Sequence, residues 1–143
     1  MALNITIRPC RQDECPVVLD LWNLAESTPS ISDSIEALKL MLLRDDDLLL
    51  VAEYHNRIIG TVMGGWDGWR ANIYRLAVLP QYRRQGIGRA LVKEIEKRLR
   101  LKGTRKISIM IEGNDELAKI FWSALDHSGY KYDPRIIRYV KNI

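Results

Sequence analysis

One segment of the sequence, residues 71–111, constrains the fold more than any other. An apolar, β-rich run predicts a strand over residues 71–79, which ends at Pro80. A basic loop with two glycines follows and leads into an amphipathic helix, predicted over residues 88–102. A second strand, buried in the interior, is predicted over residues 106–111. Because parallel strands are joined by a right-handed crossover, this unit predicts a sheet with helices packed on it.

The remainder of the 143-residue chain alternates strand-like and helix-like blocks, with no internal repeat. Further strands are predicted over residues 5–8, 48–54, 57–63 and 130–140, the last run holding one or two of them. Helices are predicted over residues 16–25, 33–42 and 114–125, the second with the capping pair Asp33 and Glu36. Turns at 55–56 and 64–69 make three consecutive strands antiparallel. We therefore expect one α/β (α+β) domain, residues 1–143, with about four helices on a mixed, mostly antiparallel sheet of six to seven strands.

Composition limits the classes of protein that remain. The chain is 47% hydrophobic, which excludes a disordered chain. No stretch is long and apolar enough for a membrane span and no signal peptide is evident, so we expect a cytoplasmic protein without a membrane partner. Cys10 and Cys15 are too few for a disulfide framework and are predicted to be reduced thiols. No metal site is expected.

The positive charge of the chain is concentrated in one place. Residues 83–106 hold ten Lys and Arg against two Glu, a net charge of +8 within a chain of net charge +4. The other 119 residues therefore carry −4. An anionic ligand, a nucleic acid or a solvated helix face would each account for this excess.

The loop inside this basic segment predicts a phosphate site. Two glycines separate a strand from a helix, where they allow a sharp turn and keep side chains away from a ligand. The first turn of a helix offers unpaired N–H donors, and Arg83, Arg84 and Arg89 add charge-assisted hydrogen bonds. The dinucleotide fingerprint is incomplete, because Leu91 stands in place of its third glycine. No Walker motif follows either.

The motif Arg83-x-x-Gly86-x-Gly88, preceded by Leu-Ala-Val-x-Pro, resembles the signature of the GCN5-related N-acetyltransferase (GNAT) superfamily. The resemblance covers most of the chain, and residues 60–68 are most similar to small bacterial members of the YpeA type. It implies the GNAT fold and acetyl-CoA as donor, with backbone N–H groups of residues 84–89 on the pyrophosphate and residues 76–78 paired with pantetheine like an added strand. The cofactor-binding residues that it implies are Leu76, Ala77, Val78, Arg83, Arg84, Gln85, Gly86, Ile87, Gly88, Arg89, Asn114 and Trp122.

The implied reaction is direct attack of a primary amine on the thioester, whose oxygen accepts a hydrogen bond from the Val78 N–H. Two positions depart from the family pattern. Trp122 stands where many members have a tyrosine that protonates the thiolate; its indole N–H either stabilises the sulfur or simply packs. Ile109 stands where the ribosomal-protein branch has a glutamate. Glu112, at the end of the same predicted strand, is therefore our candidate catalytic residue.

Other candidate residues have simpler interpretations. Asn114 matches an asparagine that contacts pantetheine, and it is also a suitable helix N-cap. Asp67 is at least as well explained as a turn residue before glycine, and His127, in a three-residue extension, as a surface residue. Glu26 begins residues 26–32, which occupy the place where relatives recognise acceptors. The tryptophans that would line an aromatic acceptor pocket, or else belong to the core, are Trp22, Trp66 and Trp69.

Three hypotheses follow from these residues. The first is an N-acetyltransferase acting on a small-molecule or peptide amine, and a homodimer is compatible with it. The second is a coenzyme A-binding domain with weak or no catalysis, because the usual tyrosine and strand glutamate are missing. The third, a nucleic-acid-binding module, ranks last because no recognition motif accompanies the basic segment, so we expect no nucleic-acid partner.

Overall fold

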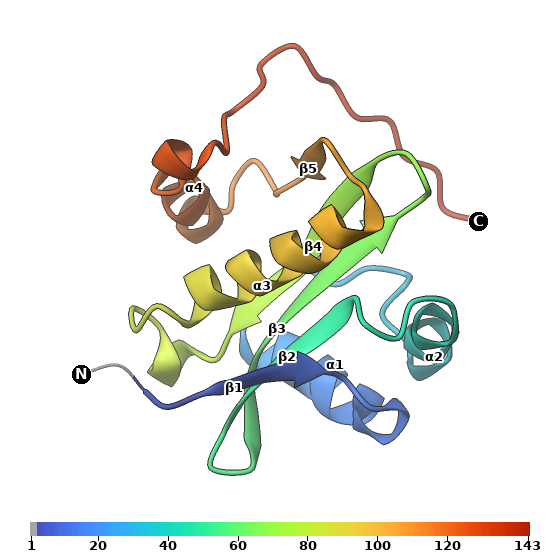
Figure 1. Ribbon diagram of the computed structural model, residues 1–143, viewed down its shortest axis with the longest axis vertical. Coiled ribbons are helices and arrows are strands. Elements are labelled where there is room, and N and C mark those ends of the chain that lie inside the picture. The colour runs from blue at the N-terminus through green and yellow to red at the C-terminus, as the bar shows by residue number, and fades with distance from the viewer. Residues whose placement is uncertain (1–2) are drawn as a thin grey trace. The chain divides into compact units, whose positions relative to one another are not determined.

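A computed structural model describes residues 3–143 of the chain (Figure 1). The chain forms two compact units, Met1–Ile109 and Met110–Ile143, and each is described here by itself. The single domain over residues 1–143 stays a prediction. Among the described residues, no helix is long and apolar enough to cross a membrane, and no three His, Cys, Asp or Glu side chains group as metal ligands.

The first unit is built on a five-stranded sheet in the order β1-β2-β3-β4-β5. The strands are β1 (Thr6–Pro9), β2 (Leu49–Tyr54), β3 (Arg57–Trp66), β4 (Ala71–Val78) and β5 (Ile107–Ile109). The first four pair antiparallel, whereas β4 and β5 pair parallel. The mixed, mostly antiparallel sheet is therefore confirmed. The expected six to seven strands are wrong by one or two, and β5 is shorter and less buried than predicted.

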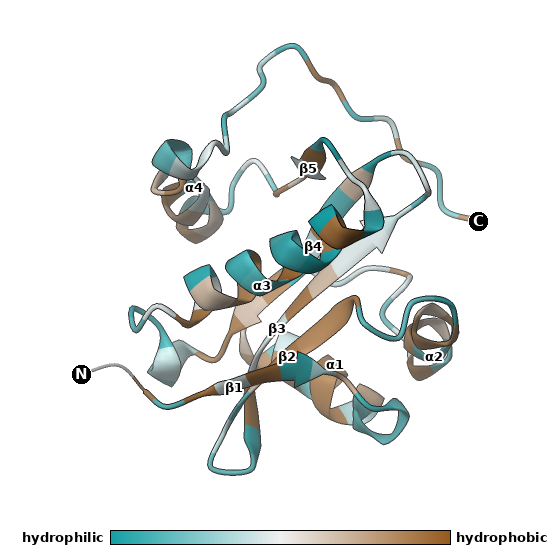
Figure 2. Ribbon diagram, viewed as in Figure 1, coloured by the Kyte–Doolittle hydropathy of each residue, from teal (hydrophilic) through white to brown (hydrophobic). Residues whose placement is uncertain are grey.

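Helices cover both faces of this sheet. The first unit has α1 (Cys15–Leu24), α2 (Ile35–Arg44) and α3 (Ile87–Lys102), with short 3-10 turns η1 (Gln12–Glu14) and η2 (Pro80–Tyr82). The indole Nε1 of Trp22 on α1 donates to Thr61 Oγ1 of β3 at 2.9 Å. Side chains alternate along a strand, so the neighbouring Gly60 faces α3 on the other side. Figure 2 shows the apolar residues of β2 and β3 between these layers and the hydrophilic outer side of α3.

Turn chemistry fixes the two hairpins that precede α3. His55 and Asn56 have φ of 49° and 60°, the left-handed conformation that a two-residue hairpin turn requires. The second turn lies further along the chain than predicted, because β3 continues to Trp66. Asp67 Oδ1 accepts the N–H groups of residues 69 and 70 at 2.8 and 2.7 Å, which identifies Asp67 as a turn residue.

Two glycines lie on the face of β3 that meets α3. A Cβ added at Gly64 would lie 2.9 Å from Cδ1 of Ile95, and one at Gly60 would lie 3.2 Å from Cδ1 of Leu91. Both α3 side chains are fully buried. The two glycines therefore let α3, which carries the loop at its N-terminus, lie directly on the sheet.

A buried carboxylate ties β1 to the start of α1. Glu14 accepts both terminal nitrogens of Arg8, at 2.8 and 2.7 Å, and the same guanidinium reaches Glu53 at 2.9 Å. The hydrogen bonds from Arg8 are the main reason that the pKa of Glu14 lies below that of an ordinary glutamate.

We expect this carboxylate to contribute to the pH dependence of stability. Because its folded-state pKa is lowered, the stabilisation is complete above the unfolded-state pKa and is lost as the pH falls toward the folded-state value. Glu14→Gln should lower the free energy of unfolding by about 1–3 kcal/mol at neutral pH. The free energy of unfolding should also fall less steeply toward acid pH in the variant than in the wild type. Urea unfolding from pH 7 down to the acid limb measures both effects. An equally steep acid limb in the variant would contradict the assignment.

The second unit contains α4 (Glu116–Ser123) and the 3-10 turn η3 (Asp126–Ser128). Asp115 Oδ1 accepts the Ala118 N–H at 3.0 Å, so Asp115 is the N-cap of α4 and the capping role considered for Asn114 is wrong. The strands predicted over residues 130–140 are absent, although this run is rich in β-formers. Its large side chains are exposed, and a strand needs a hydrogen-bonded neighbour as well as propensity.

Both cysteines belong to the core of the first unit. Cys10 and Cys15 are free and buried. Burial raises the pKa of Cys10 to about 12 and also raises the pKa of Cys15. Both side chains are therefore thiols rather than thiolates at neutral pH.

Candidate active site

The residues predicted to bind the cofactor in the first unit form one continuous surface of the chain. Leu76, Ala77 and Val78 end β4, η2 follows, and residues 83–86 form the loop that enters α3. Ile87 begins α3 and is buried, which anchors the loop, whereas Gly88 is half-buried and Arg89 is exposed. The strand, loop and first helical turn are thus adjacent.

One edge of β4 is open beside this loop. β5 pairs with β4 only at residues 71–73, so among the described residues no strand pairs with residues 76–78 on that side. The N–H of Leu79 donates to Ile59 of β3 at 2.9 Å. Because N–H directions alternate along a strand, the N–H of Val78 points away from β3, toward the open edge. This edge can accept an extended ligand as an additional strand.

A bulge precedes the open edge and was not foreseen from the sequence. The register between β3 and β4 shifts between Thr61 and Met63, where Arg75 has φ of +52°. Thr61 Oγ1 donates to the Arg75 carbonyl at 3.0 Å while it accepts the Trp22 indole N–H. A bulge bends a strand and re-aims the groups that follow, here residues 76–78. A single arginine in an apolar strand was the only sequence signal.

The loop after η2 turns sharply before α3 begins. Arg84 and Gly86 have φ of +62° and +81°. Gly86 is the N-cap of α3 and supplies no side-chain cap, and nothing lies within 4 Å of a Cβ placed there. The first turn of α3 therefore lacks a side-chain cap, and the positive end of the helix dipole there stabilises an anion.

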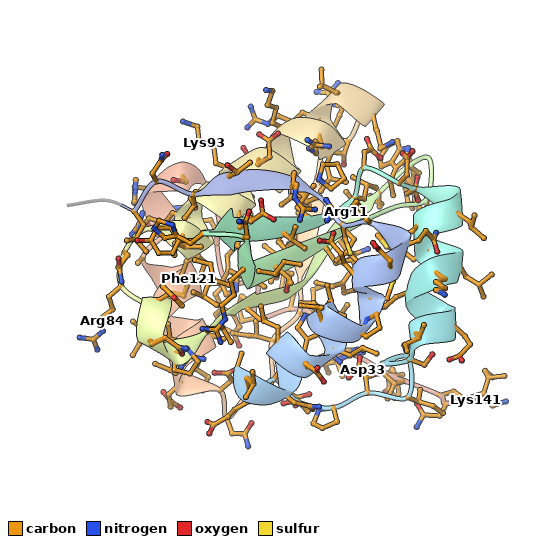
Figure 3. The ribbon with its side chains drawn as sticks, turned by 90° about the horizontal axis from the view of Figure 1, so that it is seen from below. Arg11, Asp33, Arg84, Lys93, Phe121 and Lys141 are labelled. Atoms are coloured by element: carbon orange, nitrogen blue, oxygen red, sulfur yellow. The ribbon has the colours of Figure 1, made fainter. Side chains whose placement is uncertain are left out.

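The three arginines expected at this loop have different environments. Arg83 donates from Nε to the Val78 carbonyl and from Nη2 to the Ala25 carbonyl, each at 3.1 Å. The Arg83 guanidinium thus connects the end of β4 to the C-terminus of α1 by two hydrogen bonds. Arg84 projects away from the loop into solvent (Figure 3), and Arg89 is also exposed. Arg84 and Arg89 therefore differ from Arg83 in that their side chains are exposed to solvent.

The remaining predicted site residues lie in the second unit. Glu112 and Asn114 are exposed in the segment before α4. Trp122 is half-buried on α4, with its ring centroid 5.2 Å from those of Phe121 and Tyr130. Trp122 therefore packs in an aromatic cluster of its own unit. His127 is exposed in η3.

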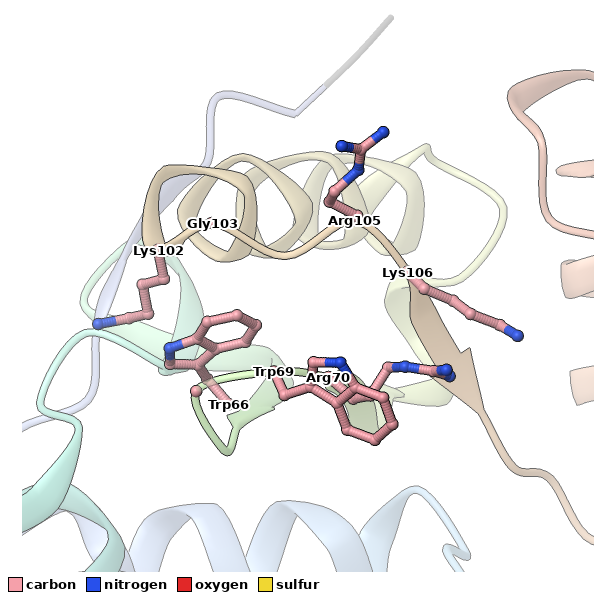
Figure 4. Close-up of a pocket in the computed structure, with 8 residues that line it drawn as sticks. Trp66, Trp69, Arg70, Lys102, Gly103, Arg105 and Lys106 are labelled. Carbon is pink, nitrogen blue, oxygen red and sulfur yellow. The ribbon is translucent and has the colours of Figure 1, made fainter.

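The three tryptophans considered for an acceptor pocket do not gather. Trp22 is buried beneath the sheet, whereas Trp66 and Trp69 border a surface pocket of about 340 Å³ (Figure 4). That pocket lies between the β3–β4 turn and the C-terminal end of α3, the opposite end of this helix from the glycine loop. Its basic side chains, Arg70, Lys102, Arg105 and Lys106, extend in different directions.

Comparison with known proteins agrees with this geometry. The model of the acetyltransferase (GNAT) family matches residues 17–125. An acetyltransferase from Pectobacterium atrosepticum is 39% identical over 116 residues, 80% of this chain and 82% of the relative.

Two solved structures share the fold. PaiA N-acetyltransferase from Thermoplasma acidophilum, in complex with coenzyme A, is 18% identical with a TM-score of 0.71 over 85% of this chain and 88% of that one. AAC(6')-Iy, in complex with a CoA-S-monomethyl-acetylneamine bisubstrate analogue, is 20% identical with a TM-score of 0.75 over 98% and 99%.

Proposed function

The chain belongs to the GNAT family of acetyltransferases, and from this premise we propose that it transfers an acetyl group from acetyl-CoA directly to a primary amine. The family assignment makes acetyl-CoA the cosubstrate. The acceptor proposed is a small-molecule or peptide amine.

The observation that carries the proposal is the open edge of β4 beside the glycine loop. Pantetheine would extend along residues 76–78, and the Val78 N–H points to that side. The N–H groups of residues 84–89 and the exposed Arg84 and Arg89 would hold the pyrophosphate. Coenzyme A, a nucleotide whose extended arm contains amide groups, therefore fits both the open edge of β4 and the glycine loop.

The chemistry required of the chain is modest. The Val78 N–H donates to the thioester oxygen, on which negative charge develops as the amine nitrogen attacks the carbonyl carbon. The C–S bond then breaks and coenzyme A leaves as a thiolate, while the amine nitrogen loses a proton. We assign the proton to the carboxylate of Glu112, directly or through a water molecule. Trp122 contributes packing, or an indole N–H to the sulfur, because indole does not act as an acid at neutral pH.

The role of Glu112 can be tested by removing its charge. Glu112→Gln should lower kcat about 10²-fold or more, and the acid limb of the kcat/KM profile, which reports protonation of the base, should disappear. Glu116→Gln, in the first turn of α4, is the matched control and should keep the wild-type profile. A profile unchanged in Glu112→Gln would exclude this residue as the base.

The proposed activity is tested by mixing acetyl-CoA with amines of four classes and following the release of coenzyme A. The panel contains spermidine, neamine, single amino acids and a tripeptide with a free N-terminus. Turnover with any member supports acetyl transfer. Binding of coenzyme A without turnover of any amine would favour a coenzyme A-binding domain with little catalysis, consistent with Trp122 and Ile109 at the two departing positions.

A further inference from the structure

Two arginines, Arg75 of β4 and Arg83 of the loop after η2, hold the connection between α1 and α2. We call residues 25–34 the α1–α2 segment. At its start, the Ala25 carbonyl accepts Arg83 Nη2 at 3.1 Å. Further along, the Thr28 carbonyl accepts Arg75 Nη1 at 2.8 Å. Each arginine directly precedes a stretch that acetyl-CoA would contact in the proposed function, residues 76–78 and residues 84–89.

Asp33 completes this attachment. The sequence suggested Asp33 as the cap of α2, but Ser34 caps it, accepting the Ala37 N–H at 3.1 Å. The Asp33 carboxylate instead accepts Arg75 Nη2 at 2.6 and 2.7 Å and the Ser30 N–H at 2.9 Å. The Arg75 and Asp33 side chains are only 17% and 20% exposed, so water screens their ion pair less than a surface pair.

The backbone of Arg75 links these contacts to the shape of β4. A non-glycine residue with positive φ is strained, and such strain persists only where the surroundings hold it. Here Thr61 holds the Arg75 carbonyl and Asp33 holds its guanidinium, which also lies 4.8 Å from the centre of the Trp22 ring. The same residue thus forms the bulge before residues 76–78 and attaches the α1–α2 segment.

We propose that Arg75 and Asp33 are a positioning pair that couples the α1–α2 segment to the strand along which acetyl-CoA binds. This inference rests on the proposed function. A ligand paired with residues 76–78 fixes the backbone of the bulge, and the guanidinium transmits that order to Thr28, Ser30 and Asp33. The α1–α2 segment therefore becomes more ordered when the cofactor binds.

Hydrogen exchange of the full chain, with and without saturating coenzyme A, tests the coupling. In the wild type, coenzyme A should slow exchange in the peptide covering residues 25–34 about fivefold or more, and it should also slow exchange at the start of α3.

In Asp33→Asn and Arg75→Lys, coenzyme A should no longer slow exchange in the α1–α2 segment but should still slow it at the start of α3. Both variants should bind coenzyme A with less than a threefold change in Kd by calorimetry. Asp33→Glu, which retains the carboxylate, should restore the slower exchange in part. Glu36→Gln, an exposed carboxylate in the first turn of α2, is the matched control and should behave as wild type.

The outcomes separate this inference from the proposed function. If wild-type protein binds no coenzyme A, the proposed function fails and the inference fails with it. If coenzyme A binds but exchange in the α1–α2 segment does not change, or changes equally in folded Asp33→Asn, the coupling is refuted while the function stands. Circular dichroism of each variant establishes that it is folded.

Discussion

Coenzyme A should no longer bind to a Gly86→Asp variant that remains folded. The site would lose the charge complementarity on which binding depends, because a carboxylate would occupy the open space at the N-terminus of α3. We expect a loss of at least about 100-fold in affinity, close to 3 kcal/mol. Aspartate is among the residues that tolerate positive φ, and a carboxylate at a helix N-terminus is favourable. The fold should therefore survive a change that removes binding.

Calorimetric titration with coenzyme A measures this effect, and two variants isolate its cause. Gly86→Asn adds a side chain of the same size without the charge and should lose less affinity than Gly86→Asp. Gly103→Asn imposes a similar substitution at the other end of α3, where φ is also positive and nothing lies within 4 Å of an added Cβ. It should bind coenzyme A as the wild type does. Wild-type affinity in folded Gly86→Asp would refute the loop as the pyrophosphate site.

Gly64→Val should produce the largest loss of stability among the single changes considered. A Cβ there would already lie 2.9 Å from Ile95 Cδ1 and 3.0 Å from its Cγ1. Ile95 is fully buried and has no room to retreat. Overpacking of this kind costs about 2–3 kcal/mol, or a fall of roughly 5–10 °C in Tm for a chain of this size.

A matched glycine and a compensating change make the cause identifiable. An added Cβ at the adjacent Gly65 would lie 3.0 Å from Cε2 of Tyr74, a residue that is 40% exposed rather than fully buried like Ile95, so Gly65→Val should cost less. Combining Gly64→Val with Ile95→Ala should destabilise less than the sum of the two, by about 1 kcal/mol or more. Additive losses in thermal and urea unfolding would show that the clash is not with Ile95.

Much of the first unit was predictable because local rules and tertiary packing agree there. The hairpin at His55 and Asn56, the strand that ends at Pro80 and the glycine-flanked α3 each follow from turn chemistry or periodicity. Boundaries moved by one to three residues, and Ser34 replaced Asp33 as the cap of α2. The conformation of the loop was the most predictable part of the candidate site, since the turn into α3 uses a positive φ at Gly86 that glycine readily adopts.

The remainder could not be predicted because it depends on long-range contacts. The bulge at Arg75 is held by Thr61, and the guanidinium is used by Thr28 and Asp33, all distant in sequence. Arg83 was expected to meet phosphates, but its side chain binds two carbonyls that no local pattern reveals. Residues 130–140 show the converse case, in which strong β-propensity finds no strand to pair with.

The burial of Cys10 and Cys15 has a practical consequence for enzymology. A chromogenic thiol reagent, which reacts with thiolates, would detect released coenzyme A with almost no background from the folded enzyme. Both cysteines are buried and their pKa values are raised, so neither is a thiolate at neutral pH. On denaturation both sulfurs become reactive. One colorimetric assay can therefore report turnover while the protein is native, and report its unfolding as two new equivalents of colour per chain when a variant loses its structure.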